Sequence, residues 1–351
     1  MKYPIDLERE LQEDFYPPMP RPYGMPPAKS RKFNPPITPR ENFELFRQRK
    51  LPVWAVNFGM DVQTIQPMCM PDASARSFGG IDWFGIDWEF EPKSNAAMVR
   101  PGTRRLSDIS KWREEIIWPD LNDIDWQKNY DETYRDTLSA DRPVNFVIVN
   151  GLFERTADLT SFSDAFMYLL TDAEELTAFY VKLREWHMEL IKIARDIYGA
   201  DIITFHDDMG SQRASFMSPE TFREVMLPHY QYINDECHKM GLTTNFHSCG
   251  SVGNLLPLYI EAGWDMWEGQ ASANDMHALA VQYIDKLAFE NFMRPAPGAT
   301  DEEIKAEIDK RLTIWGKDGR YLISYMDVEN PDSVKKWQEY IYARSRELYG
   351  S

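Results

Sequence analysis

The chain has 351 residues, of which 43% are apolar and 27% charged, the balance of a folded globular protein. Its 56 acidic and 39 basic residues give a formal net charge of −17, which argues against binding to nucleic acid or to an anionic membrane. The chain has no run of about 18 apolar residues, no apolar leader and only 3 cysteines. We therefore expect a cytoplasmic protein with no membrane span and no disulfide framework.

The N-terminal region is rich in proline. Ten of the 23 prolines precede residue 40, and proline fixes φ and lacks an N–H donor. We expect a proline-rich N-terminal arm over residues 1–42 and a single catalytic domain over residues 43–351. The arm either wraps the surface as an extended segment or is a disordered leader, and the sequence leaves both open.

Seven short apolar runs, rich in β-branched and aromatic residues, follow the arm and are predicted to be strands. Helical stretches lie between them, which is the pattern of parallel βα units. The predicted strands are Pro52–Met60, Val144–Phe153, Ala200–Asp208, Thr243–Gly250, Trp264–Gln270, Leu287–Phe292 and Tyr321–Met326.

Several helix starts can be recognised between these runs. Thr171–Glu174 and Thr300–Glu303 have the sequence of capping boxes, in which Thr and Glu satisfy the free N–H groups of the first turn. Ser218-Pro219 and Asn330-Pro331 each place a capping residue before a proline. Apolar residues at helical spacing predict a helix over 172–198, which ends before Gly199.

Two architectures contain repeated βα units: an open doubly wound sheet and a closed (β/α)8 TIM barrel. The first predicted strand is followed by no glycine-rich phosphate loop, which weakens the dinucleotide-binding alternative. Polar residues gather where the predicted strands end, as they do at the active-site face of a barrel. We therefore expect an α/β protein of the (β/α)8 barrel type, with the Trp-rich segment 72–135 covering its mouth.

The end of the run Thr243–Gly250 carries a candidate metal site. Side chains alternate along a strand, so His247 and Cys249 lie on one face, and an imidazole beside a thiolate is a natural start for a zinc site. The alternative is a buried histidine beside an inert core cysteine. Glu268 ends the next predicted strand and is the candidate third ligand, or else a base on His247 or a solvated carboxylate.

Carboxylates also end two earlier runs. Asp207 and Asp208 close one of them and are candidate catalytic residues, as general acid, general base or substrate anchor. The alternative makes one of them a helix cap and the other a partner of an arginine. Glu154 is a third catalytic candidate, acting in acid/base chemistry, or it is the ion-pair partner of Arg155.

Three segments of the chain together resemble the uroporphyrinogen decarboxylase superfamily. They are Asp207–Gln212, Ser218–Tyr230 and His247–Gly250, and Gly80–Gly85 and Gly151–Arg155 are similar to its corrinoid-linked methyltransferase branch. The resemblance covers roughly residues 45–348. It implies a (β/α)8 barrel and, in methyltransferase members, a zinc ion held by the H-x-C pair and a later thiolate.

The chain departs from the family pattern in three places. True decarboxylases carry arginines that meet the tetrapyrrole carboxylates, and the run Pro52–Met60 has none. The later thiolate is missing near Ser324–Met326, so the resemblance leaves Glu268 to complete the zinc site with His247 and Cys249. Phe289–Phe292 replaces the usual Gly-Gly-x-Asp stretch, which faces substrate in relatives, so we expect a different substrate.

The sequence therefore predicts a zinc-dependent methyltransferase that moves a methyl group between a small or aromatic donor, such as a methoxylated aromatic (O-demethylation), and a separate corrinoid (cobalamin) protein. An alternative is a metal-free, uroporphyrinogen-decarboxylase-like lyase that acts on a planar carboxylated substrate. A third hypothesis is a non-catalytic binding protein on the same fold. The sequence leaves a homodimer open, together with the direction of methyl transfer.

Overall fold

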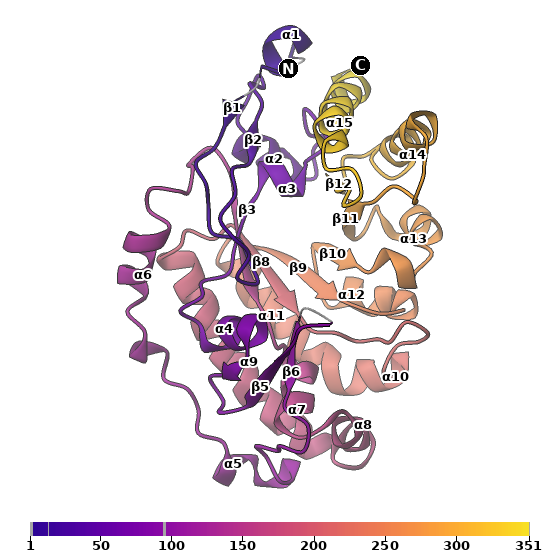
Figure 1. Ribbon diagram of the computed structural model, residues 1–351. Helices are drawn as coiled ribbons and strands as arrows, with labels where there is room; N and C mark the ends of the chain where they lie inside the picture. The colour runs from indigo at the N-terminus through magenta and orange to yellow at the C-terminus, as the bar shows by residue number, and fades with distance from the viewer. Residues whose placement is uncertain (1–2, 13, 94–95, 351) are drawn as a thin grey trace.

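The computed structural model describes residues 3–12, 14–93 and 96–350, and its centre is a curled parallel sheet (Figure 1). Seven strands follow one another in the order β12-β11-β10-β9-β8-β7-β3, each parallel to its neighbour. They are β3 (Gln63–Ile65), β7 (Val144–Ile148), β8 (Ile202–His206), β9 (Thr243–Ser248), β10 (Met266–Gly269), β11 (Ala288–Met293) and β12 (Tyr321–Tyr325). Six of the seven predicted runs overlap one of these strands.

The strand predicted at Pro52–Met60 is wrong. Residues 53–57 are irregular, α3 (Phe58–Asp61) follows, and the strand at this edge of the sheet is β3. Side chains take the hydrogen bonds that a neighbouring strand would make here. The side-chain amide of Asn42 accepts from Val53 N and donates to Trp54 O, and the Asp61 carboxylate accepts from Asn57 N. One strand-like bond, from Ile323 N to Val56 O at 3.0 Å, joins the segment to β12. The expected eight-stranded barrel is thus a seven-stranded curled sheet with an irregular segment between its two edges.

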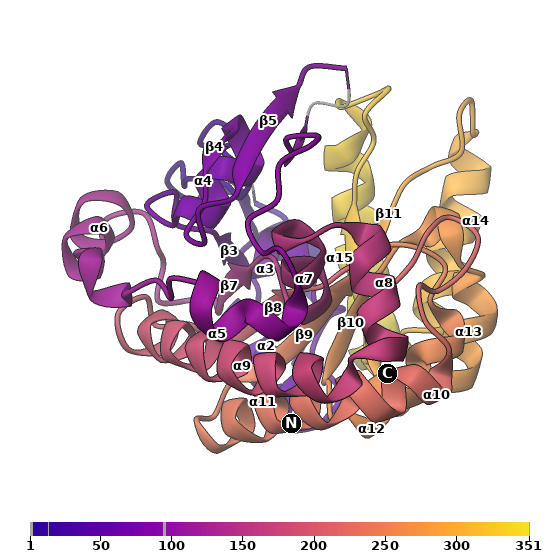
Figure 2. The same ribbon diagram turned by 90° about the horizontal axis from the view of Figure 1, so that it is seen from below.

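Helices that follow the strands cover the outside of the sheet. Contacts between α9, α11 and α12 form one continuous wall, and Figure 2 shows these helices side by side. The helices from β7 onward are α7 (Leu152–Leu159), α8 (Phe162–Thr171), α9 (Ala173–Asp196), α10 (Pro219–Thr221), a π-helical turn η3 (Phe222–Met226), α11 (Leu227–Lys239), α12 (Leu256–Glu261), α13 (Met276–Tyr283), α14 (Asp301–Ile314) and α15 (Ser333–Gly350).

The predicted helix starts have mixed outcomes. Thr300 and Glu303 form the expected capping box, and Ser218 accepts from Thr221 N. Thr171 forms no capping box, because it is the last residue of α8 and Asp172 precedes α9 without a side-chain bond. The helix predicted after Asn330 begins at Ser333 instead.

A second layer, formed by residues 71–133, packs against the parallel sheet where β7 ends. In Figure 2, α4, β4 and β5 lie together on the side away from α9, α11 and α12. The buried guanidinium of Arg155 on α7 attaches this layer by ion pairs to Asp72 and Asp82. Its elements are α4 (Pro71–Phe78), β4 (Gly80–Ile81), β5 (Asp87–Glu91), β6 (Ala96–Val99), η1 (Ile109–Lys111), α5 (Trp112–Glu115), η2 (Leu121–Asp123) and α6 (Trp126–Thr133).

The N-terminal residues form a short helix and a narrow ribbon before α2 (Pro39–Arg47). They are α1 (Leu7–Glu10) and the antiparallel strands β1 (Asp14–Phe15) and β2 (Arg31–Lys32). Glu10 is fully buried and pairs with Arg346 of α15, which explains why the two ends of the chain lie together in Figure 1. The expected boundary between an arm of residues 1–42 and the catalytic domain stays a prediction.

Trp, Phe, Tyr and Met side chains form much of the core. One large cluster joins the sheet to the outer helices, and a smaller cluster that includes Phe43, Phe46, Met266 and Leu322 fills the interior of the sheet beside α2. Within the described residues, no helix is both long enough and apolar enough to cross a membrane.

Candidate functional site

Four ionisable side chains form a row across neighbouring parallel strands. His206 of β8 is in register with His247 of β9, His247 with Glu268 of β10, and Glu268 with Glu290 of β11. Residues in register on adjacent parallel strands point to the same side of the sheet. The row lies near the carboxyl ends of its strands, which is where loops build active sites in this type of fold.

His247 is at the centre of the site. Its Nδ1 lies 3.3 Å from Oε2 of Glu268, and its Nε2 lies 3.5 Å from Sγ of Cys249 and 3.8 Å from Oδ1 of Asp208. Burial disfavours the imidazolium, but Glu268, Cys249 and Asp208 raise the pKa of His247 well above its usual value. The structure therefore brings together the three residues predicted as metal ligands, with Glu268 and Cys249 on different ring nitrogens.

A second imidazole is stacked on the first. The ring centroids of His206 and His247 are 4.1 Å apart and the rings are nearly parallel, at 14°. Nδ1 of His206 lies 2.8 Å from Glu154, whose other oxygen accepts from Arg76 of α4. Burial alone would raise the pKa of Glu154, but His206 and Arg76 lower it to about 2. Glu154 is thus paired with Arg76 and His206, whereas Arg155 binds Asp72 and Asp82.

Asp208 connects the loop after β8 to the loop after β9. Its Oδ1 accepts from the backbone N–H of Cys249 at 2.7 Å, and its side chain keeps 27% of its surface exposed. Metal-binding atoms of His206, Asp208 and His247 all lie within 4.8 Å of one another. The site therefore offers imidazole and carboxylate groups to one small volume, and the thiol of Cys249 lies beside His247.

Asp207 is turned away from this group of side chains. It is fully buried, and it accepts from the backbone N–H groups of Phe153 and Glu154 and from the hydroxyl of Tyr230. Burial and the charge of Glu154 raise its pKa to about 7. These contacts fix the start of α7 to the end of β8, so the geometry gives Asp207 the capping role that the sequence left as its alternative.

Glu290 is the most unusual member of the row. Both its carboxylate oxygens are buried, and no donor other than the Glu268 carboxyl faces them among the described residues. Burial, followed by the negative charge of Glu268, raises the pKa of Glu290 well above its usual value. Glu290 lies in the stretch where the chain departs from the family pattern.

Sequence reasoning missed His206 and Arg76 as site residues. His206 stands directly before the predicted Asp pair, and its position two residues before Asp208 was a usable signal. Arg76 comes from the covering layer. Nothing in its local sequence marks it, because it reaches the site only through the tertiary fold.

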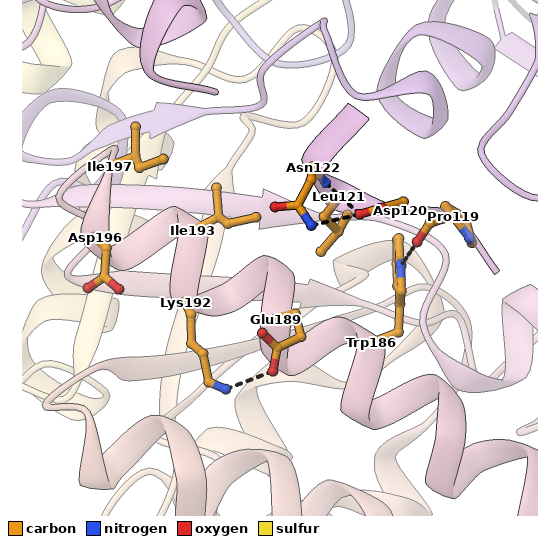
Figure 3. Close-up of a pocket in the computed structure, with 10 residues that line it drawn as sticks. All are labelled: Pro119, Asp120, Leu121, Asn122, Trp186, Glu189, Lys192, Ile193, Asp196 and Ile197. Atoms are coloured by element: carbon orange, nitrogen blue, oxygen red, sulfur yellow. Dashed lines mark hydrogen bonds and ion pairs between the residues drawn. The ribbon is translucent and has the colours of Figure 1, made fainter. Parts of the chain in front are cut away.

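An open groove lies outside this site. It has a volume of about 430 Å³ and runs between η2 and the C-terminal half of α9 (Figure 3). Its walls hold an ion pair between Glu189 and Lys192 and a bond from the indole of Trp186 to Pro119 O. None of its lining residues belongs to the row at the carboxyl ends of the strands.

Comparisons with solved structures agree with the fold. A methyltransferase from Methanosarcina mazei superposes with a TM-score of 0.55 at 16% sequence identity, over 84% of this chain and 82% of its own. A dihydropteroate synthase from Coxiella burnetii matches at a TM-score of 0.28 and 14% identity, over 53% of this chain and 61% of its own. A sugar phosphate isomerase/epimerase from Parabacteroides distasonis matches at a TM-score of 0.32 and 10% identity, over 67% of this chain and 81% of its own. The last two similarities are too low to support an argument.

Comparison of sequences identifies the family. No curated protein matches the chain. The family model described as uroporphyrinogen decarboxylase (URO-D) matches residues 81–324, well over half of the chain, and that range contains the whole row from His206 to Glu290. The chain therefore belongs to the uroporphyrinogen decarboxylase (URO-D) family.

Proposed function

We propose that the protein is a zinc-dependent methyltransferase that passes a methyl group from a small donor, such as a methoxylated aromatic, to a separate corrinoid protein in the cytoplasm. The observation that carries the proposal is the contact between Nε2 of His247 and Sγ of Cys249 at 3.5 Å. A thiolate and an imidazole in contact near the carboxyl ends of parallel strands are a donor pair typical of zinc.

Two distances from His247 support its sharing an ion with a neighbouring side chain. Two ligands of a tetrahedral zinc ion, each 2.0–2.3 Å from the metal, are separated by roughly 3.5 Å. Sγ of Cys249 and Oδ1 of Asp208 lie 3.5 Å and 3.8 Å from Nε2 of His247, so each has the separation expected of a co-ligand of this histidine. His206 is an alternative to Cys249 as a ligand, because its metal-binding atom lies within 4.8 Å of those of His247 and Asp208. Three protein ligands leave the fourth position of the ion for the donor's oxygen.

Glu268 then supports the site instead of binding the ion. Its carboxylate contacts Nδ1 of His247, and the carboxylate of Glu154 contacts Nδ1 of His206. Each imidazole therefore has a carboxylate partner at one ring nitrogen. A carboxylate of this kind fixes the tautomer and orientation of a metal-binding histidine and increases its basicity. This arrangement favours the alternative role of Glu268, as a base on His247, over its predicted role as third ligand.

Zinc at this position would act as a Lewis acid on the donor's oxygen while the methyl group leaves. The residues of the chain supply placement: Asp208 fixes the Cys249 loop through its backbone N–H, and Arg76 fixes Glu154. The structural similarity to a protein named as a methyltransferase supports methyl transfer as the reaction. The corrinoid acceptor follows from the resemblance to the corrinoid-linked branch.

Metal content measured by plasma mass spectrometry tests the proposal. We expect about one zinc ion per chain in the purified protein and its loss in His247→Ala and Cys249→Ser, because each removes a ligand. Matched controls are His238→Ala, which lies at the surface beside Asp265, and Cys69→Ser, and both should keep the metal.

A second measurement tests the reaction. The zinc-loaded protein is incubated with a methoxylated aromatic and a reduced corrinoid protein, and methyl-cobalt formation is followed by absorbance. Protein that stays free of metal after reconstitution with zinc would overturn the proposed mechanism. Conversion of a carboxylated substrate in the absence of corrinoid would favour the lyase instead.

A further inference from the structure

The N-terminal ribbon reaches from the C-terminal helix toward the candidate site. Its base is fixed by the pair of Glu10 with Arg346 and by the guanidinium of Arg142, which lies 3.7 Å from the ring centroid of Tyr16. From there β1 and β2 run side by side, with a further bridge between Met19 and Ala28. The turn at the tip is closed by a bond from Arg21 Nε to Pro26 O.

Two contacts seat this tip on the rim of the parallel sheet. The backbone N–H of Tyr23 donates to Oε1 of Gln66 at 2.8 Å, and Gln66 directly follows the carboxyl end of β3. Gly24 lies against Phe78, so closely that a Cβ at this glycine would stand 2.2 Å from the ring. Phe78 ends α4, the helix whose Arg76 bonds Glu154. The tip is therefore held beside the site from both sides.

Tyr23 has the backbone conformation of a residue that its surroundings constrain. Its φ is +57°, in the left-handed region that non-glycine residues seldom adopt, and such strain persists where tertiary contacts over-determine the backbone. Tyr23 as a whole residue keeps 45% of its surface exposed. Burial raises the pKa of Tyr23, and the charges of His247 and Glu268 act on the phenol.

We propose that Tyr23 is a substrate-contacting residue, supplied by the N-terminal ribbon, that covers the mouth of the site beside His247. Its phenol offers a hydroxyl donor and an aromatic face to a small molecule bound between the ribbon tip and the row of strand residues. The part of the inference that concerns substrate depends on the proposed methyl transfer. The part that concerns cover does not.

Alkylation of Cys249 tests the cover directly. Iodoacetamide labelling is followed with time and resolved by peptide mass spectrometry in proteins of matched metal content, with Cys69 as an internal reference. Tyr23→Ala should label several-fold faster at Cys249, and Tyr23→Phe, which keeps the ring, should label at the wild-type rate. Phe15→Ala removes an exposed ring from the same ribbon away from the tip and is the matched control.

A displaced tip should have the same effect. Gly24→Val places a branched side chain at φ +62° against Phe78, so Cys249 should again label faster although the phenol is intact. Equal Cys249 rates in wild type, Tyr23→Ala and Gly24→Val would overturn the inference. If Tyr23→Ala and Gly24→Val label faster at Cys249 but the protein binds no zinc, the inference that Tyr23 covers the site stands. Only the proposed function is then rejected.

Turnover tests the contact with substrate. With a methyl donor that the wild type converts, Tyr23→Ala should raise KM more than it lowers kcat, because the lost contact serves binding. Tyr23→Phe should recover most of the KM if the ring face makes the contact, and little if the hydroxyl does. Unchanged KM and kcat in both variants would reject Tyr23 as a substrate-contacting residue.

Discussion

Glu268 lies 3.3 Å from Nδ1 of His247, on a different ring nitrogen from the one that faces Cys249. The two residues are in register on adjacent strands, so the backbone of the sheet sets their separation. Glu290, in register on the far side of Glu268, faces the Glu268 carboxyl and meets no other donor among the described residues. The His247 ring is therefore held by a carboxylate that is itself placed by the sheet.

Glu268→Gln should weaken zinc binding without abolishing it. Loss of a carboxylate that supports a metal-binding histidine costs about 10–100-fold in affinity, whereas loss of a ligand empties the site. Zinc affinity measured by competition with a chromophoric chelator gives the comparison with His247→Ala. Glu154→Gln is the matched variant, because Glu154 supports the imidazole of His206 in the same way. A loss of zinc affinity in Glu268→Gln as large as that in His247→Ala would show that Glu268 is itself a ligand.

Arg155→Met should destabilise the layer over residues 71–133. Arg155 is fully buried between Asp72 and Asp82, and removing one partner of a buried ion pair costs about 3–5 kcal/mol because the remaining charges stay buried. The free energy of unfolding in urea measures this loss. Adding Asp72→Asn to the variant should recover part of it, and a loss below about 1 kcal/mol in Arg155→Met would contradict the buried pair.

The strands and the centre of the site are predictable from the sequence because both depend on local pattern. A buried apolar run predicts a strand, and the alternation of side chains along a strand places His247 and Cys249 on one face. His206 was missed because its partner Glu154 is 52 residues away in the sequence. Thr171 failed as a cap for a similar reason, since α8 extends to that residue and no local signal marks where one helix stops and the next begins.

The first predicted strand failed through side chains that lie outside it. The run Pro52–Met60 has the apolar character of a strand, but the side chains of Asn42 and Asp61 bond backbone groups that a ladder would need. Side-chain amides and carboxylates that bond the backbone compete with secondary structure. A pattern of apolar residues cannot reveal that competition, since the competing groups come from α2 and α3.

Asp61→Asn should change how stability depends on pH. Burial raises the pKa of Asp61 to about 6 from an ordinary 3.8, although Asn57 N–H and the Trp54 indole favour the ionised form. The folded state therefore binds a proton that the unfolded state has released, and wild-type stability falls by up to about 3 kcal/mol as pH rises from about 4 to above 6. In the variant, the asparagine side-chain oxygen can still accept from Asn57 N–H and from the Trp54 indole. Because asparagine does not ionise, this contribution to the pH dependence of stability is lost.

Urea unfolding of both proteins at pH 4.5, 5.5 and 7.5 measures the effect. The free energy of unfolding of the variant minus that of the wild type should become more positive as pH rises, with most of the change between about 4 and 6. A difference that is the same at all three pH values would show that Asp61 ionises in the fold as it does in water.

Glu10→Ala should release the N-terminal ribbon while the parallel sheet stays folded. Glu10 is fully buried, its two oxygens accept from Arg346 and Tyr342, and its loss leaves Arg346 without that carboxylate. A local cost of about 3 kcal/mol corresponds to a roughly 150-fold rise in transient opening of the ribbon. Limited proteolysis should then cut within residues 14–32 at a correspondingly higher rate, with Glu8→Ala on the exposed side of α1 as the control. Cleavage at the wild-type rate would mean that the tip contacts at Gln66 and Phe78 hold the ribbon without its base.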